Sequence, residues 1–276
     1  MARPRWTTVV VAGLCVLAGC GGFGGQPDAD VEETVTPAPV PSVPTDSPQR
    51  ASNGGIDADT VAADHWRALN GTSHTARTSV RWRYRNGSTY DETTVHRVGP
   101  DREQFLAVAD YGRPRGPINR TGHELWYDGE RSVFRVESRD GGPVFRLIDT
   151  EVAIQYPGTS LIRGLFARLQ PVDVRQTALD NTVVTGPVSG VYGLQGLSQF
   201  RDERDVTMAA QITPAGYVGR IAIGFDATVR GDPVDARVTI SFTDVGSTTV
   251  RKPDWVENAS RRSGTSTPVV GRPLGS

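Results

Sequence analysis

The chain has 276 residues, with 30 basic and 31 acidic side chains, so its formal net charge is −1. A charge so close to neutral gives no electrostatic basis for binding nucleic acid. With two cysteines and 37% hydrophobic residues, the chain has to be stabilised by an apolar core rather than by a disulfide framework.

The first 20 residues have the pattern of a lipoprotein leader. Arg3 and Arg5 precede an apolar run over residues 7–17, which is the charged start and short apolar core of a signal peptide. The run is too short to span a bilayer. It closes on Leu17-Ala18-Gly19-Cys20, which resembles a prokaryotic lipobox, and the resemblance implies a diacylglycerol on Cys20 after removal of residues 1–19. We expect an exported protein anchored to the outer face of the cell membrane, because two acyl chains give stable attachment.

This leader also excludes thiol chemistry. Cys15 is removed with it and Cys20 carries the lipid, so no thiol remains for a catalytic nucleophile, a disulfide or a thiolate metal site. Loss of Arg3 and Arg5 leaves 28 basic and 31 acidic residues, a net charge of −3.

Composition divides the rest of the chain into three parts. Residues 20–55 are rich in Gly, Pro, Thr and Ser, and such a segment does not bury enough apolar surface to fold. It is predicted to be an extended tether. Residues 56–259 are long enough for one domain with its own core, and residues 260–276 are predicted to be a disordered tail.

The domain is predicted to open with an amphipathic helix. Asp57 or Asp59 can cap its N-terminus, and Asn70-Gly71 ends it. The residues on or near its apolar stripe are Val61, His65, Trp66 and Leu69.

After this helix the pattern is mostly that of strands. Residues 80–85 alternate apolar and cationic side chains, which is typical of a strand with one buried and one wet face. Asn86-Gly87 favours a hairpin turn. Further strands are predicted at 89–98, 104–109, 124–127, 132–138, 144–148, 172–184, 191–197, 206–213, 217–225, 236–243 and 248–251.

One more helix interrupts the strands. Within residues 157–170, apolar side chains recur at helical spacing from Leu161 to Leu169, and Pro171 ends the segment. Short turns between consecutive strands imply antiparallel pairing. The predicted fold is therefore mainly β (α+β): one large curved antiparallel sheet, a half-barrel, with the N-terminal and mid-chain helices covering its concave face.

This order of elements, behind a lipobox and a Pro-rich tether, resembles the lipoprotein-carrier (LolA/LppX-like) superfamily. The most similar stretch is residues 212–221, which has the pattern of a hairpin, followed by the strand at 237–242. The chain is also similar to uncharacterised lipoproteins of archaeal envelopes. The resemblance covers the architecture of residues 56 to about 256 and includes no catalytic motif. It implies a half-barrel whose apolar concave face holds acyl chains and whose mouth is closed by helices.

Apolar residues that share a strand face, and three on the mid-chain helix, are the candidate ligand contacts. Same-face strand residues are also what the core of any β-sandwich needs, and core packing is the favoured interpretation of each set. The predicted ligand-binding residues are Val80, Trp82, Tyr84, Leu161, Leu165, Phe166, Ile221, Ile223, Phe225, Ile240 and Phe242, with Val238 on the same face as the last two.

No motif for catalysis, a metal or a cofactor is found. His123-Glu124 begins like a zinc-protease helix but has Tyr127 where the second histidine belongs. His65, His74 and His96 lack ligand spacing and are predicted to be surface or hydrogen-bonded histidines. We expect no enzymatic activity, no cofactor and no bound metal.

Two surface features remain. Arg81, Arg83 and Arg85 form a cationic row that either faces solvent, the favoured interpretation, or meets lipid headgroups or a partner. The acidic pair Asp202-Glu203 with Arg204-Asp205 is interpreted as a solvated turn. Four N-glycosylation sequons are predicted to lie in turns or at element ends, at Asn70, Asn86, Asn119 and Asn258.

Two functions are compatible with this pattern. The first is a non-enzymatic, membrane-anchored protein that binds a lipid or another hydrophobic ligand in a half-barrel cavity. The second is an envelope sensor or assembly protein of the same fold, with a filled interior, that binds another protein through its sheet face. If Trp82, Phe166, Ile223 and Phe242 contact one another and leave no void, this would count against the first function, binding of a ligand in a cavity.

Overall fold

A computed structural model describes residues 56–115, 120–139, 141–148, 158–170, 173–191 and 197–263. The predicted leader, Cys20 and the tether lie outside these residues. Among the described helices, none has the length and apolar character needed to cross a membrane.

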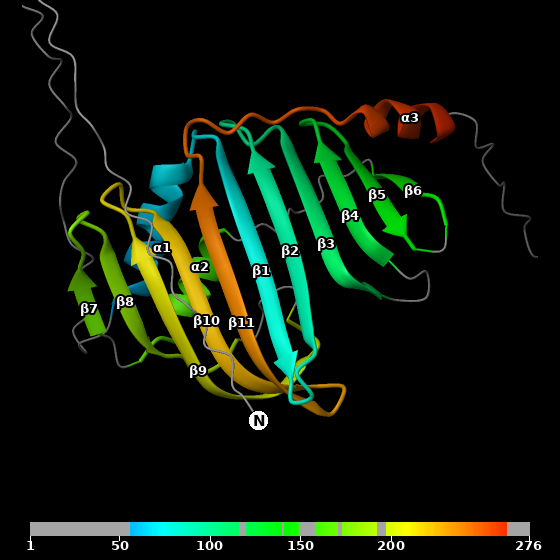
Figure 1. Cartoon of the computed structure of the whole chain (residues 1–276). Helices are drawn as coiled ribbons and strands as arrows, with labels where there is room; N and C mark the ends of the chain where they lie inside the picture. Colours follow the sequence, from blue (N-terminus) through cyan, green and yellow to red (C-terminus); the bar gives the residue numbers. More distant parts are fainter. Residues whose placement is uncertain are drawn as a thin grey trace, which may run out of the picture. The chain divides into compact units, whose positions relative to one another are not determined.

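Within the described residues, eleven strands form a single antiparallel sheet that is not closed into a barrel (Figure 1). The predicted mainly β architecture is confirmed. The strands are β1 (His74–Tyr84), β2 (Thr89–Val98), β3 (Phe105–Arg115), β4 (Arg120–Tyr127), β5 (Ser132–Ser138), β6 (Val144–Ile148), β7 (Asp173–Gln176), β8 (Thr182–Pro187), β9 (Phe200–Ile212), β10 (Val218–Val229) and β11 (Asp232–Thr243).

The order of strands across the sheet is β6-β5-β4-β3-β2-β1-β11-β10-β9-β8-β7. Two runs of consecutive strands, β1 to β6 and β7 to β11, therefore lie side by side. They are joined through the pairing of β1 with β11, in which Thr75 lies opposite Thr243 and Tyr84 lies opposite Val234. Because side chains alternate between the two faces of a strand, this register fixes which residues share a face across the whole sheet.

Helix α1 (Ala58–Leu69) begins and ends where the sequence predicts. The carboxylate of Asp57 accepts hydrogen bonds from the backbone N–H groups of Asp59 and Thr60, which satisfies two of the free donors of the first turn. Asn70 is the C-cap, and the positive φ of Gly71, 74°, turns the chain toward β1.

The helices α1 and α2 (Thr159–Phe166) pack on one face of the sheet, which we call the inner face. Figure 1 draws both behind the strands from β8 to β11. His65 of α1 packs edge-on against Phe242 of β11, with the ring centroids 4.6 Å apart, and its Nδ1 accepts the N–H of Val218 at 3.1 Å. The main core therefore lies between these helices and the strands β1 and β8 to β11.

A third helix, α3 (Asp254–Ser263), is not predicted by the sequence and packs on the opposite, outer face. Val256 and Ala259 contact a small cluster that includes Trp126 and Val133. Trp255 donates its indole N–H to Glu124, 2.6 Å away, and Glu124 also pairs with Arg135 at 2.7 Å. The helix extends past residue 259, where the sequence predicts the domain to end.

Several predicted strands differ from the observed ones. The strand predicted at 172–184 is two strands, because Asp180, with φ 56°, turns the chain between β7 and β8. Residues 248–251 form no strand and instead lead into α3. The charged residues 202–205 lie within β9 rather than in a turn. Most of the strand predicted at 191–197 lies outside the described residues.

Candidate functional site

The eleven predicted ligand-binding residues come together as core. Nine are buried members of the cluster between the inner face and the helices, and Tyr84 and Leu161 pack against that cluster. Trp82, Phe166, Ile223 and Phe242 are each at most 3% exposed. These residues therefore lie in the core between the inner face and the helices α1 and α2, and a role in ligand binding stays a prediction.

The rest of the inner face, on β1 to β4, is built differently. It carries aromatic and titratable side chains among small apolar ones, and the smaller cluster of Val98, Phe105 and Ala107 on this side includes no residue of a described helix. The residues called the polar cluster below are Trp82, Tyr90, Glu92, His96, Tyr111 and His123, of which Trp82 and Tyr90 are also buried members of the main core cluster.

Strand register places these six side chains on one face. Trp82 pairs with Tyr90, and Glu92, two residues further along β2, pairs with Tyr111 of β3. His123 of β4 lies opposite Ala109, which precedes Tyr111 by two residues. The cluster therefore runs diagonally over four adjacent strands.

Aromatic contacts fix the rings at one end of the polar cluster. Trp82 stacks on Tyr90 with a centroid distance of 3.8 Å and packs edge-on against Phe200 at 5.3 Å. The Trp82 indole N–H is buried and has no hydrogen-bond partner among the described residues. A buried donor without an acceptor costs about 1–3 kcal/mol, so an acceptor placed there by a ligand would recover this energy.

The other end of the polar cluster holds a histidine and a tyrosine in hydrogen-bonding contact. The Tyr111 hydroxyl and His123 Nδ1 lie 2.8 Å apart, and the ring centroids of His123 and Phe134 lie 5.1 Å apart.

Burial, together with the charge of Arg120, lowers the pKa of His123. Burial lowers the pKa of His96 to about 4, with a smaller contribution from His123. Both imidazoles are therefore neutral near pH 7.

Of the two predicted alternatives, surface or hydrogen-bonded histidines, the second holds for His65 and His74: His65 Nδ1 accepts the N–H of Val218, and His74 Nδ1 lies 2.8 Å from the Thr72 carbonyl oxygen. His65, His74 and His96 are all buried. Burial also lowers the pKa of His65 to about 4 and, more moderately, that of His74. In the described part of the chain, no three His, Cys, Asp or Glu side chains are grouped as metal ligands would be.

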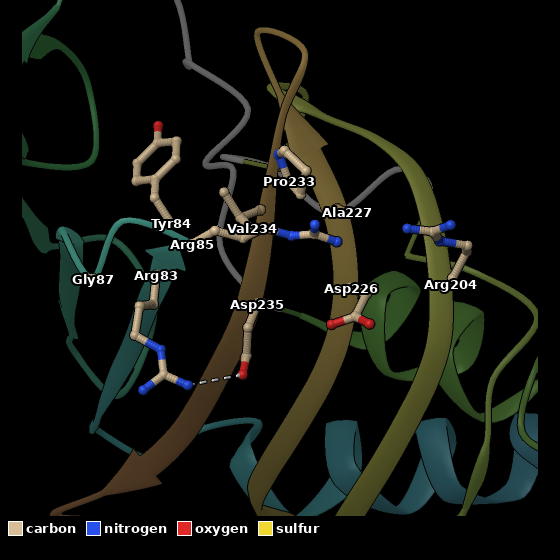
Figure 2. A pocket seen from close by; sticks show the side chains of 10 residues that line it. All are labelled: Arg83, Tyr84, Arg85, Gly87, Arg204, Asp226, Ala227, Pro233, Val234 and Asp235. Carbon is tan, nitrogen blue, oxygen red and sulfur yellow. Dashed lines mark ion pairs between the residues drawn. The ribbon is translucent and has the colours of Figure 1, made fainter.

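A surface cavity of about 370 Å³ lies at the hairpin ends of β1 and β11. Figure 2 shows the guanidinium of Arg83 directed toward Asp235, 3.7 Å away, while the Tyr84 ring points away from that pair. In strand register, Arg83, Asp235, Asp226 and Arg204 are successive neighbours across four strands. The row places Asp235 directly opposite Asp226, a like-charge pair that costs stability, and flanks the two with one arginine on each side. We interpret the cavity as a self-neutralising charge row rather than a ligand site.

The sequons do not all lie in turns. Asn70 is the exposed C-cap of α1, and Asn86 lies in the β1–β2 turn, where its side-chain oxygen accepts from Ser88. Asn258 lies inside α3, which corrects the prediction for that site. Asn119 lies outside the described residues.

The sequence analysis missed the polar cluster, although β2 carries a signal for it. Tyr90, Glu92, Thr94, His96 and Val98 alternate along a single face. Two potentially charged residues on the same face as Tyr90 and Val98 break the usual separation of apolar and polar faces. Pairing of Trp82 with Tyr90 across the Asn86-Gly87 hairpin would have identified that face as the inner one.

Comparisons with known proteins give weak likenesses only. No protein-family model and no curated protein matches the chain. Among solved structures, a DUF1329 family protein from Desulfovibrio piger aligns with a TM-score of 0.31 and 10% identity, over 74% of this chain and 97% of that one. A LolA superfamily protein from Nitrosomonas europaea aligns with a TM-score of 0.26 and 8% identity, over 73% of this chain and 97% of that one. A chain of the MucA/MucB complex of Pseudomonas aeruginosa aligns with a TM-score of 0.31 and 13% identity, over 73% of this chain and 60% of that one. Because such TM-scores reflect only partial superposition, the fold assignment rests on the sheet topology described above.

Proposed function

We propose that this chain is an exported, membrane-anchored binding protein without enzymatic activity, which holds a lipid or another largely apolar ligand on the inner face of strands β1 to β4. The anchor is the lipid on Cys20. The ligand lies over the polar cluster, at the margin of the main core cluster to which Trp82 and Tyr90 belong.

The observation that carries this proposal is the division of the inner face into two parts. One part is closed by helices and lined by aliphatic and aromatic side chains. The other combines rings with a few hydrogen-bonding groups, which is the composition of sites that bind an apolar body and orient one polar end. The buried indole N–H of Trp82 supplies a donor for a ligand carbonyl or phosphate oxygen.

Organic extraction followed by mass spectrometry tests the proposal. The chain of residues 21–276, which keeps every described element, is expressed in its native host and purified without detergent. We expect a lipid in stoichiometric amount, whose identity names the ligand class. A clean extract, together with no uptake of lipids offered in solution, would contradict the proposal.

A second candidate function is the binding of another envelope protein through a sheet face, with the interior filled. The observation in its favour is the packed state of the eleven residues first predicted to contact the ligand. A clean extract combined with co-purification of one envelope protein in constant ratio would favour this function over the first.

A further inference from the structure

The outer face of the central strands carries more arginines than carboxylates, with Asp91, Asp226 and Asp235 among the arginines. Its exposed arginines are spread over β1, β2, β10 and β11, and we call them the arginine patch. They are Arg77, Arg81, Arg97, Arg220 and Arg237. The predicted row of Arg81, Arg83 and Arg85 contributes only its first member.

Ion pairs neutralise little of this charge. Arg81 pairs with Asp91, although both side chains are more than half exposed. The other four arginines have no ion-pair partner in the described part of the chain. Arg81 even lies directly opposite Arg237 in the β1–β11 register, an arrangement that costs stability. In a chain whose net charge is −1, this local excess of positive charge is a segregated feature.

The surface between the two levels of arginines on β1, β10 and β11 is made of small side chains. The arginines lie at two levels along the strands, Arg77 with Arg220 at one level and Arg81 with Arg237 at the other. Between these two levels, a row of small side chains crosses four neighbouring strands: Thr93, Ser79, Thr239 and Ala222. Along β1 the two arginine levels are about 13 Å apart, and Arg77 lies about 10 Å from Arg220 across two strand spacings. The patch therefore extends in two dimensions.

We propose that the arginine patch docks on an anionic lipid bilayer surface. Protein interfaces depend on buried aromatic or aliphatic anchors at their centre, whereas the central row of this patch has only Ser, Thr and Ala side chains, and Val95 beside Arg77 is its one aliphatic neighbour on β2. Attraction to an anionic membrane needs no such anchor, since each arginine near the surface contributes separately. All five arginines are exposed on the same face of the sheet, so a membrane surface can meet them from one side. This inference concerns a different face from the proposed ligand site and does not depend on it.

Vesicle co-sedimentation tests the patch with the chain of residues 21–276. The probes are vesicles of phosphatidylcholine alone and vesicles with equal parts of phosphatidylglycerol. The triple variant Arg77→Gln, Arg220→Gln, Arg237→Gln is compared with Arg139→Gln, Arg146→Gln, Arg251→Gln, which removes the same charge from exposed arginines elsewhere. A thermal melt confirms that each variant folds.

We expect the unmodified chain to bind the anionic vesicles and not the neutral ones. The patch variant should bind about a hundredfold more weakly, about fivefold for each arginine, and the control variant should lose much less. About 1 M salt should abolish binding, because the Debye length falls to about 3 Å. Equal losses in both variants, or no preference for anionic vesicles, would overturn the proposal. Binding of soluble polyglutamate without vesicle binding would instead identify an acidic protein partner and would also overturn it.

Discussion

At the scale of single residues, the inner face differs from an ordinary core in the polar groups that it buries. The Trp82 N–H has no acceptor in the described part of the chain, and His96 and Glu92 are at most 8% exposed. Buried polar groups are normally hydrogen-bonded. Under the proposed function, the ligand supplies the acceptor that the Trp82 indole N–H lacks in the described part of the chain.

Replacing Trp82 by Phe tests the role of this donor. We expect Trp82→Phe to change the free energy of unfolding by about 1 kcal/mol or less, because the lost ring packing is offset by removal of an unsatisfied donor. The amount of co-purified lipid should fall severalfold. Urea unfolding and mass spectrometry measure the two effects.

Trp126 provides the matched control, since its indole N–H is also buried without a partner but lies on the outer face beneath α3. Trp126→Phe should leave the lipid content unchanged. An equal loss of lipid in both variants would show that the Trp82 N–H does not contact the ligand.

At the scale of elements, strand periodicity predicted which side chains share a face, because alternation is a local property of the backbone. It did not reveal that the inner face has two halves, because that depends on where α1 and α2 dock. Helix α3 was missed because, among residues 254–259, only Val256 and Ala259 are buried, which is too short an apolar pattern to predict a helix. The turn at Asp180 was missed because Leu179 continues the apolar pattern, although its side chain is 79% exposed.

Close approach of β3 and β4 depends on a glycine. A Cβ on Gly122 would lie 2.5 Å from the Ala109 carbonyl oxygen, whereas one on Gly224 would lie 3.7 Å from Thr207 Oγ1, an ordinary contact. We expect Gly122→Ala to lower the free energy of unfolding by about 1–3 kcal/mol because the strands have to separate. Gly224→Ala should be neutral or slightly stabilising, because alanine restricts the unfolded chain. Similar urea midpoints for the two variants would contradict this account.

Docking of α3 depends on the hydrogen bond from Trp255 to Glu124. Hydrogen bonds to charged groups contribute about 1.5–3 kcal/mol. In Trp255→Phe we expect amide hydrogen exchange over α3 to become at least about tenfold faster, while exchange in β10 and β11 stays the same. Lys252→Gln is the control, since the Lys252–Glu257 pair, at 3.8 Å, is exposed and contributes little. Unchanged exchange in Trp255→Phe would show that apolar contacts alone hold the helix.

At the scale of the whole molecule, acid should destabilise the fold through its histidines. Burial lowers the pKa values of His65 and His96 from 6.5 to about 4. The unfolded chain therefore binds protons at a higher pH than the folded one, and each pKa unit corresponds to about 1.4 kcal/mol. Stability should be complete above pH 6.5 and should decrease as the pH falls toward 4.

Urea unfolding at several pH values measures this loss. In His65→Asn, which keeps an acceptor for the Val218 N–H, the decrease between pH 6.5 and 4 should be smaller than in the unmodified chain. The carboxylates are the same in both proteins, so the difference isolates His65. Identical pH profiles would indicate that His65 protonates equally easily in the folded and unfolded chains.

The pairing of β1 with β11 also has a consequence for the order of folding. Strands β1 to β6 pair with their neighbours in sequence, as do β7 to β11, so each run forms through short loop closures. Only the β1–β11 ladder, with Thr75 opposite Thr243, joins the two runs, and it closes a loop of most of the described chain, at a high entropic cost. We expect each meander to assemble early and their joining to limit the folding rate, so that a chain arrested during synthesis would hold the first meander with the edge of β1 still open.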